Sequence, residues 1–561
     1  MKRVPVLLLV VVLLLGVNHG SFAQNLENIK SGEKVKISGQ LGASMVFYNV
    51  TGREANRPSF SWMLVGNPVV DIYGLSLPFS LTVSEQQRSF QQPFNKFGVS
   101  PTYKWAKLHL GYRDVNFSKY TLGGHTMLGV GGEFTPGKFR LGFMYGRLMK
   151  AVDADPITQN EPYTSRIPTY RRDGLSFKAG YGTNANYIDF VLFKGHDILN
   201  SIDTLSQHSV APVENVVFSI ITKQRFLKKF EFYLEYANSI YTKDTRLDSL
   251  PSIGISSPFL GLIKKNSSTS QGNAIETYFG YSTKVFNIKL RFRQIDPGFN
   301  SLGTYFIQND LRNITIEPGV SLASGKYIIG SSLGFQRDNL KNTLTQQTNR
   351  TIWSMRFSAR PINWYNLDVS YSNFDISQSK ANYSLDSLYK ISQTTQSITI
   401  TQNFSITGTT FMHNFLLSFN NQKLTDNNKA TENTNSYNTN MWMGSYMVSY
   451  MPLRMNMSLT YTYSHFKLDI MDTKYFGPVI SVSTSFFKNK MNVALSDSYF
   501  NNRVNNLDVS NINILSFTTS YRLKKKHQFK ARYNLHTNNA MDASISSYRE
   551  TTGEIGYSFI F

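Results

Sequence analysis

A set of basic residues stands at alternate positions in segments that otherwise carry apolar or aromatic side chains. Residues 288–293, for example, read IKLRFR, so that every second side chain is basic. A Lys or Arg facing lipid at mid-depth would cost roughly 2 to 4 kcal/mol, so we expect these side chains to point into a lumen or to lie near strand ends. The set consists of Lys107, Arg113, Arg140, Lys289, Arg291, Arg293, Arg356, Arg360, Lys530 and Arg532.

The chemistry that such rows offer is electrostatic. Rings of positive charge favour anions in a pore. The alternative is that inward acids such as Glu231 and Glu235 pair with these charges, or that lipid head groups anchor them near the turns. The depth of each residue in the membrane would decide between a charged pore and these alternatives, and the sequence does not give that depth. The lumen-facing candidates are Lys289, Arg291, Arg293, Arg356, Arg360, Lys530 and Arg532.

Two further basic runs, Lys228-Lys229 and Lys524-Lys525-Lys526, fall in short connections between apolar segments. Such runs attract the anionic phospholipid of a membrane leaflet, or a partner protein. Solubility of an exposed turn is the simpler explanation.

The connection 243–272 has a centre that is too apolar for a loop lying only in water, with Ile253, Ile255, Phe259, Leu260, Leu262 and Ile263. It is expected to fold into the lumen as a plug, to dock a partner protein, or to pack on itself. The connection 150–171 carries Asp153, Asp155 and Glu161 among Asn and Thr. These are ordinary loop carboxylates, with a calcium site as a minor alternative.

Enzyme and metal motifs are weak. His109 and His125 lie near each other in sequence, yet neither has metal-ligand spacing to a second His or a carboxylate. Ser, His, Asp and Glu are too widespread for one hydrolytic triad to be chosen. The chain has no cysteine, which excludes disulfides, thiolate metal sites and cysteine catalysis. The sequence therefore predicts no catalytic residue, no metal and no cofactor.

The elements that carry these residues show apolar and polar side chains alternating with a period of two, from Val35 to the C-terminus. Segments 139–146, 353–360, 455–463 and 529–535 repeat the pattern of 35–47. This is the pattern of strands with one apolar and one polar face. After the N-terminal segment, no stretch reaches the roughly 18 apolar residues of a membrane helix.

Short and long connections alternate along the chain, which is the plan of a transmembrane β-barrel with short periplasmic turns and long extracellular loops. We therefore predict an all-β, antiparallel up-and-down barrel of about 26 strands, with 22 to 26 as the range. In hydrocarbon every backbone polar group must be paired, so the first and last strands must join. The predicted long connections are 50–59, 150–171, 197–213, 243–272, 299–311, 339–349, 375–391 and 425–435.

The N-terminus has the pattern of a secretory signal peptide: Lys2 and Arg3, an apolar run, and a small-x-small site before Gln24. We predict a signal peptide at 1–23 with cleavage between Ala23 and Gln24, a short periplasmic segment at 24–33, and a barrel at 34–561. The short segment is expected to leave no room for a plug domain. An even strand number places both termini in the periplasm.

The last strand, with Ile555, Tyr557, Phe559 and the terminal Phe561, resembles the assembly signal of bacterial outer-membrane β-barrel proteins. The stretch 97–126, FGVSPTYKWAKLHLGYRDVNFSKYTLGGHT, is similar to large barrels of Bacteroidota. The resemblance implies a Gram-negative outer membrane. The partners it implies are outer-membrane lipid, lipopolysaccharide and the barrel assembly machinery; other envelope proteins are further candidates, and nucleic acid is not expected despite the net charge of +22.

A barrel of this width needs something in its lumen, since barrels of about 22 strands already carry a plug. The sequence therefore favours a loop-gated or partner-gated, porin-like transport pore, or the barrel subunit of an export or assembly complex, and not an enzyme. The alternatives from other classes are a barrel lipase or protease and a structural scaffold.

Overall fold

The computed structural model describes residues 35–85, 95–154, 167–250, 260–380, 390–429, 431–543 and 545–561. The predicted signal peptide at 1–23, its cleavage site at Ala23 and Gln24, and the predicted periplasmic segment at 24–33 lie outside the described residues.

Strands make up nearly all of the described chain. They are β1 (Val35–Ser38), β2 (Gln40–Thr51), β3 (Phe60–Gly66), β4 (Val69–Ile72), β5 (Leu75–Ser84), β6 (Lys96–Val99), β7 (Thr102–Tyr103), β8 (Ala106–Asp114), β9 (Thr126–Phe134), β10 (Phe139–Met149), β11 (Arg172–Gly182), β12 (Tyr187–Asp197), β13 (Glu214–Phe226), β14 (Phe230–Thr242), β15 (Thr269–Ser282), β16 (Phe286–Ile295), β17 (Leu311–Leu322), β18 (Tyr327–Arg337), β19 (Gln346–Ile362), β20 (Tyr365–Lys380), β21 (Ser392–Thr407), β22 (Phe411–Asp426), β23 (Tyr437–Tyr450), β24 (Met455–Leu468), β25 (Asp472–Phe486), β26 (Met491–Val504), β27 (Leu507–Leu523), β28 (His527–Ala540) and β29 (Tyr548–Ile560).

Helices occur only as short pieces within the described connections. They are η2 (Leu199–Ser201), α2 (Thr204–Ser209), η3 (Leu260–Leu262), η4 (Ala323–Gly325) and α3 (Glu432–Asn435). None of the described helices is long and apolar enough to cross a membrane.

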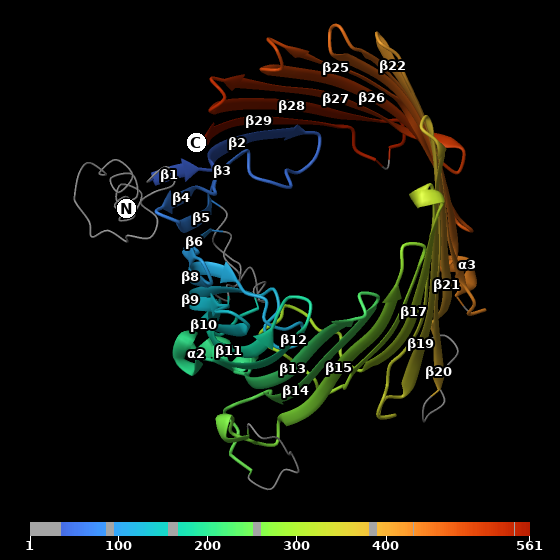
Figure 1. Ribbon diagram of the computed structural model, residues 1–561. Helices are drawn as coiled ribbons and strands as arrows, with labels where there is room; N and C mark the ends of the chain where they lie inside the picture. The colour runs from blue at the N-terminus through green and yellow to red at the C-terminus, as the bar shows by residue number, and fades with distance from the viewer. Residues whose placement is uncertain are drawn as a thin grey trace.

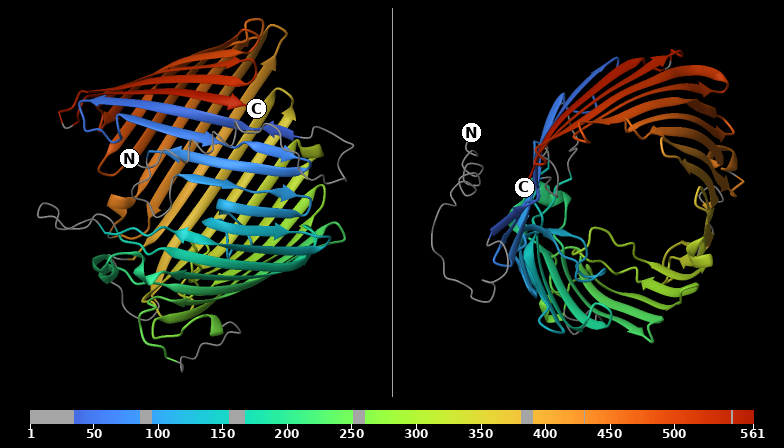
Figure 2. Two further views of the ribbon diagram at one scale, coloured as in Figure 1. Left: turned by 90° about the vertical axis from the view of Figure 1, so that its left-hand side faces the viewer. Right: turned by 45° about the horizontal axis from the view of Figure 1, so that its top comes forward.

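The strands form one closed antiparallel barrel (Figure 1). Three successive pairs of segments, β1 with β2, β3 with β4 and β6 with β7, each act as one interrupted strand, so the wall has 26 strands. This confirms the predicted fold class and strand number. The strands are strongly tilted, and the barrel encloses a wide interior (Figure 2).

The predicted pairing of the first and last strands is confirmed for β2. It pairs with β29 from Gln40 opposite Ile560 to Thr51 opposite Arg549. The preceding segment, β1, differs from the expectation because it pairs with β4 and not with the last strand. Gly39 separates the two segments with φ at +116°, and a Cβ there would lie 2.5 Å from the carbonyl oxygen of Asn67, so only glycine fits this kink.

Short turns join the strands at one end of the barrel. Several are tight turns with consecutive left-handed residues, such as Lys524 and Lys525 between β27 and β28. At the other end the connections are mostly long, as predicted. Two corrections follow: connections 469–471 and 505–506 at this end are as short as the turns, and residues 269–272 and 375–380 extend strands β15 and β20 into predicted loops.

The wall is poorest in hydrogen bonds between β5 and β8. There β6 pairs with β8 only over Gly98–Val99, and β7 only over Thr102–Tyr103. By contrast, β21 and β22 pair without interruption from Gln393 to Thr407. Side chains strengthen this sector from within: Arg113 on β8 donates to Ser80 Oγ (2.7 Å) and to the carbonyl oxygen of Pro78 (3.2 Å) around β5.

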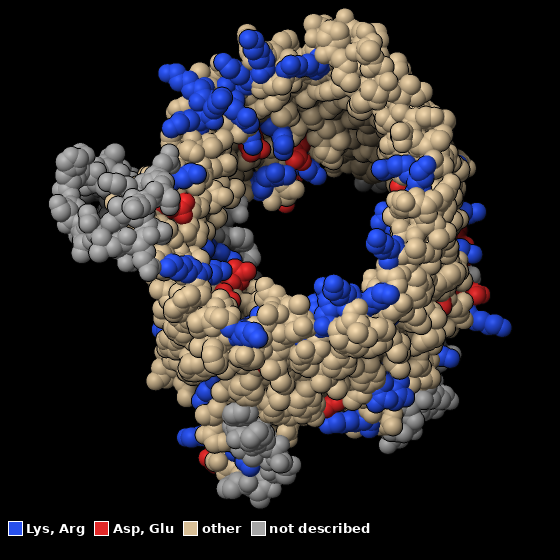
Figure 3. Space-filling view, in the orientation of Figure 1, with Lys and Arg blue, Asp and Glu red and all other residues tan. Residues whose placement is uncertain are grey.

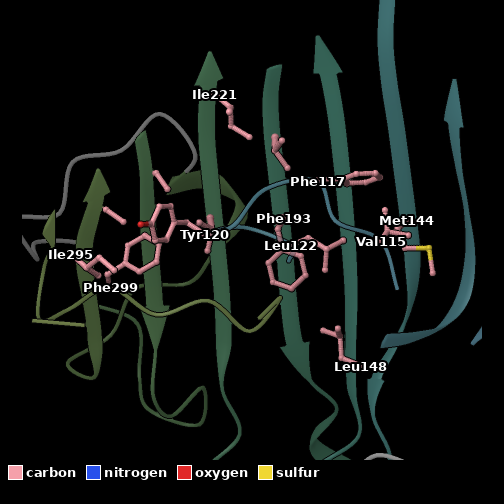
Figure 4. Packing of buried hydrophobic residues seen from close by; sticks show 14 of the residues in the cluster. Val115, Phe117, Tyr120, Leu122, Met144, Leu148, Phe193, Ile221, Ile295 and Phe299 are labelled. Carbon is pink, nitrogen blue, oxygen red and sulfur yellow. The ribbon is translucent and has the colours of Figure 1, made fainter. Parts of the chain in front are cut away.

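The outer face of the barrel carries exposed apolar and aromatic side chains, as one face of each alternating strand requires. Examples are Phe139 on β10, Leu290 on β16 and Trp442 on β23. The main cluster of buried apolar side chains lies on the other face, within the lumen (Figure 4). It forms where side chains of two connections that fold inward pack against inward-facing side chains of the wall strands.

Candidate functional site

Two connections fold into the lumen and pack on the inner wall. Residues 115–125 join β8 to β9, and residues 296–310 join β16 to β17; we call them together the inner-loop layer. They lie inside the ring, against β10 to β16 (Figure 1). The prediction placed a loop at 299–311 but did not anticipate that either connection would enter the lumen.

Aromatic side chains carry the packing of this layer. Tyr120 and Phe299, one from each connection, meet edge to face with ring centroids 6.0 Å apart. Leu122 and the wall residue Phe193 are fully buried beside them (Figure 4). Full burial of one such side chain contributes roughly 1.5 to 3 kcal/mol, so the cluster holds the layer firmly against the wall.

Small residues on the wall make room for this contact. A Cβ at Gly142 of β10 would lie 2.7 Å from the ring of Phe117. At Gly272 of β15 a Cβ would overlap the backbone nitrogen of Phe299. The wall under the inner-loop layer is therefore shaped to receive it.

Buried carboxylates anchor the layer by hydrogen bonds. Glu235 of β14 accepts from Ser118 Oγ at 2.6 Å and from Tyr233 Oη at 2.5 Å. Glu276 of β15 accepts from Tyr120 Oη at 2.7 Å and forms an ion pair with Lys119. Because a buried charge is costly unless it is paired and hydrogen-bonded, these two glutamates fix the position of the layer.

The two connections also bind each other and the wall. Gly123 N donates to the carbonyl oxygen of Gly303 (3.1 Å), and Ser301 Oγ donates to that of Thr121 (2.7 Å). Asn215 of β13 donates to Asn300 O (3.2 Å) and accepts from Leu302 N (3.1 Å). The layer is thus one unit with β13 as its base.

His125 closes the layer at its edge by stacking on Tyr305, with ring centroids 4.2 Å apart. Burial, together with the nearby charges of Arg172 and Lys96, lowers the pKa of His125 from 6.5 to about 4. The neutral ring is therefore the form that packs.

Acidification should loosen this contact. The pKa of His125 is 6.5 when the ring is exposed and about 4 in the folded protein. As the pH falls from 6.5 towards about 4, protonation therefore favours the undocked layer, and the docked layer loses up to about 3 kcal/mol of stability. Hydrogen exchange of residues 115–125 should rise over that range relative to a His125→Phe variant, which keeps a ring but cannot titrate. Equal exchange in both proteins at every pH would contradict the assignment.

The seven predicted lumen-facing cations fall in three places on the wall. Lys289, Arg291 and Arg293 lie on β16, on the face of Ile295, which packs in the buried cluster inside the barrel. Arg356 and Arg360 lie on β19, opposite the exposed Trp353 and Met355. Lys530 and Arg532 lie on β28 beside the closing strand. The set is not one ring; five of the seven share the sector from β16 to β19.

Some of these cations are paired and others are not. Arg291 lies 4.0 Å from Glu276 and 3.7 Å from Glu317, Arg356 lies 3.5 Å from Asp368, and Arg532 lies 3.9 Å from Glu554. Within the described ranges, the remaining four have no carboxylate at ion-pair distance. These four are Lys289, Arg293, Arg360 and Lys530.

The acids named as their partners bind other groups. Glu231 pairs with Arg225 at 2.8 Å and with Lys223 at 3.4 Å, and Glu235 serves the inner-loop layer. Sequence alone does not reveal which inward acid meets which base, because strand register sets the pairing.

The opposite side of the lumen is neutral and polar. Hydroxyl and amide side chains bond across neighbouring strands there: Ser445 to Thr460 at 2.8 Å, Ser458 to Ser481 at 2.6 Å, and Asn420 Nδ2 to Thr399 at 2.8 Å. The lumen therefore has a charged side, with the inner-loop layer, and an uncharged hydrogen-bonding side.

The remaining candidates for chemistry are structural. Ser100, His109 and Glu133 form a hydrogen-bonded chain, with Ser100 Oγ 3.2 Å from Nδ1 of His109 and Glu133 Oε1 2.9 Å from its Nε2. The residue types are those of a hydrolase, but Ser100 is 6% and His109 3% exposed, which leaves no approach for a substrate. The chain ties the sparsely paired β6–β8 sector together instead.

The carboxylates of connection 150–171 show no metal site in what is described. Asp153 Oδ1 accepts from Asp203 N at 2.9 Å, and Asp155 and Glu161 lie outside the described residues. The described residues contain no group of three or more His, Asp or Glu that could hold a metal ion.

The apolar connection 243–272 packs outside the lumen where it is described. Ile263 is buried with Val216 and Ile240, on the face opposite the inner cluster, and Lys194 Nζ donates to Leu262 O at 2.8 Å. At its start, the hydrogen bond from Arg246 holds the pKa of Asp244 below its usual range. Local packing thus accounts for its described part, while Ile253, Ile255 and Phe259 lie outside the described residues.

The predicted assembly signal occupies the closing strand. Ile555 and Tyr557 are exposed on the outer face, and the ring of Phe559 meets that of Phe561 edge to face at 5.0 Å. The Phe561 backbone N donates to Gly39 O at 3.0 Å, so the last residue contacts the first strand.

A wide opening remains through the centre of the described residues (Figure 3). The inner-loop layer covers one part of the wall, and Lys, Arg, Asp and Glu side chains are visible around the rim of the opening. The site is therefore a passage with one thickened, charged side.

No protein-family model matches the chain, and no curated protein matches it. Solved structures resemble it in fold. The translocation pore of the P pilus usher PapC has a TM-score of 0.34 and 10% identity, covering 94% of this chain and 99% of that one. Acinetobacter baumannii OccAB3 gives 0.30 and 13%, over 76% and 99%. The Pseudomonas aeruginosa ferric enterobactin receptor PfeA gives 0.38 and 8%, over 93% and 81%. At these values the likeness is one of β-barrel architecture alone.

Proposed function

We propose that this chain is a bacterial outer-membrane β-barrel that forms a water-filled transport passage, narrowed on one side by the inner-loop layer. The observation that carries the proposal is the opening that remains inside a closed barrel with an apolar outer face (Figure 3). A closed sheet satisfies its backbone polar groups in hydrocarbon, and the exposed outer aromatics suit lipid. A polar inner wall suits water and hydrophilic solutes.

The short turns face the periplasm in this proposal, as do both termini, and the long connections face outward. Outer-membrane lipid and lipopolysaccharide surround the wall. Assembly depends on the barrel assembly machinery, which reads Ile555, Tyr557, Phe559 and Phe561. A Bacteroidota origin is part of the same proposal and rests on the sequence resemblance.

Gating comes from the inner-loop layer or from a partner. The layer is anchored to β13, β14 and β15, so in its docked state it narrows the passage without crossing it. A barrel this wide without a full plug would weaken the permeability barrier unless another component occupied it. The second form of the proposal is therefore a barrel subunit of an export or assembly complex, which gentle detergent extraction should recover with its partners.

Planar bilayers test the pore. The purified protein should give steady unit conductance with a preference for anions, because Lys289, Arg293, Arg360 and Lys530 lack carboxylate partners among the described residues. Bilayers that stay silent with folded protein would contradict the proposal.

Removing unpaired charge should weaken the anion preference. A Lys289→Gln/Arg293→Gln variant should lower the anion-to-cation permeability ratio by roughly five- to thirtyfold, since each of the two charges near the ion path contributes about 0.5 to 1 kcal/mol in water. The reversal potential in a salt gradient measures this ratio. The control Lys341→Gln/Lys429→Gln makes the same charge change on connections outside the strands and should leave the reversal potential unchanged; an equal shift in both would refute the role of β16.

A further inference from the structure

At the short-turn end of the barrel, every charged side chain of the turns is positive. All of the turns there lie within the described residues: 73–74, 104–105, 135–138, 183–186, 227–229, 283–285, 323–326, 363–364, 408–410, 451–454, 487–490 and 524–526. None of these turn residues is acidic, while ten of the positions from Lys138 to Lys526 are Lys. At the long-connection end acids such as Glu54, Asp203 and Asp338 occur among the bases. The two ends therefore differ in charge.

Three neighbouring turns carry half of the basic turn residues and, together with Arg522 at the end of β27, form one surface. We call it the basic rim patch; it consists of Arg454, Lys488, Lys490, Arg522, Lys524, Lys525 and Lys526. These residues are exposed, and within the described ranges none forms an ion pair. Lys and Arg cluster over this part of the rim, at the upper left (Figure 3).

The patch is continuous across the three turns. The Arg454 guanidinium donates to Asn489 Oδ1 in the next turn. Arg522 N donates to Lys490 O at 2.6 Å, and Ile560 N donates to Lys526 O at 2.7 Å, next to the C-terminus. Backbone and side-chain hydrogen bonds thus hold the basic residues of the three turns side by side.

The lysines stand where the backbone would favour other residues. Lys488, Lys524 and Lys525 have φ values of +56°, +50° and +62°, a left-handed conformation that Gly and Asn adopt with less strain.

Exposed apolar side chains lie next to these charges in the sequence. Phe487 is 68% and Leu453 61% exposed, both within the turns, and Phe486 and Leu523 end the apolar columns of β25 and β27. Apolar columns that end in aromatic residues and then in cations are the pattern of a membrane interface, with the rings among the acyl chains and the ammonium groups at the phosphates.

From these observations we infer that the basic rim patch binds the anionic phosphate head groups of phospholipid in the adjacent leaflet. The inference rests on the proposed placement in an outer membrane. An acidic soluble partner would contact the cations but would leave Phe487 and Leu453 exposed to water, so lipid fits both features of the surface.

Lipid binding by the full-length barrel tests the inference. The barrel in neutral detergent is titrated with phosphatidylglycerol and with phosphatidylethanolamine, and bound lipid is counted by native mass spectrometry. The patch variant replaces Lys488, Lys490, Lys524, Lys525 and Lys526 by Gln. It should bind phosphatidylglycerol at least about tenfold more weakly than the unmodified protein, in a salt-dependent manner.

The control variant removes five exposed lysines from the other end: Lys150, Lys243, Lys264, Lys341 and Lys429, each to Gln. It should bind phosphatidylglycerol as the unmodified protein does. Equal loss in both variants, or no loss in the patch variant, would overturn the inference. So would displacement of lipid by soluble glycerophosphate at equal concentration, which would indicate a phosphate site, or tight binding of polyglutamate without binding of phosphatidylglycerol, which would indicate an acidic protein partner.

Conductance of the same preparations separates this inference from the proposed pore. A patch variant that conducts normally but has lost lipid binding supports both proposals. Bilayers without conductance, together with intact lipid binding, would contradict the proposed pore and would still support lipid binding by the basic rim patch. Circular dichroism typical of β-sheet in all three proteins establishes that each is folded.

Discussion

A Gly272→Val variant should carry a larger and noisier current in planar bilayers than the unmodified barrel. The new side chain would overlap the backbone of Phe299, so residues 296–310 could not remain docked on β15. Overpacking of this kind costs about 1 to 3 kcal/mol, which shifts the ratio of docked to undocked loop by up to about a hundredfold. Because this connection also holds residues 115–125, the whole inner-loop layer should loosen and the passage should widen.

The matched control is Gly330→Val. Gly330 lies on β18 opposite Arg356, on the same inner face, and a Cβ there would meet nothing within 4 Å. This variant should conduct as the unmodified protein does, and protease should cleave residues 296–310 faster only in Gly272→Val. Increased cleavage with unchanged current would show that the layer does not lie in the path of ions.

Deletion of Phe561 should prevent most of the protein from reaching the outer membrane, while hardly affecting a barrel that is already folded. The residue contributes one backbone hydrogen bond to Gly39 and one ring contact with Phe559, together about 1 to 3 kcal/mol. The β2–β29 pairing from Gln40 to Thr51 stays intact without it. A large effect in cells would therefore report recognition of the last strand during assembly.

Two measurements separate these effects. Fractionation of cells should find the truncated protein in the periplasm, whereas protein refolded in detergent should melt within a few degrees of the full-length barrel. An Ile470→Ala variant, which changes an exposed apolar residue at the other end, serves as a control that inserts normally. Normal insertion of the truncated chain would refute the assembly role of Phe561.

The wall could be predicted from sequence because its rules are local. Alternation assigns each residue to a face, and the closure of a sheet in hydrocarbon then requires an even, closed set of strands. Segments 288–293 and 529–535, read in this way, have their cations on the inner face. Details failed: β1 pairs with β4 and not with the last strand, and residues 269–272 extend a strand into a predicted loop.

The inner-loop layer could not be predicted because its partners are distant in sequence. Ser118 meets Glu235 and Tyr120 meets Glu276, contacts that exist only once the barrel has closed. The sequence did contain one signal. Glu235 and Glu276 stand at positions whose side chains face the lumen, with no basic residue next to them in sequence, and a buried acid needs a partner. Composition also could not tell whether the apolar connection 243–272 turns inward or outward, and Ile263 packs outward.

The sparse pairing of β6 and β7 with β8 gives the barrel an uneven mechanical compliance. If a bulky cargo or a partner chain stretched the barrel from within, strain would concentrate where the fewest backbone hydrogen bonds join neighbouring strands. That place is Gly98–Val99 and Thr102–Tyr103, where Arg113 and His109 act as side-chain ties across the gap. Most other neighbouring strands pair over more residues, so we expect the β6–β8 line to open first when the barrel is stretched.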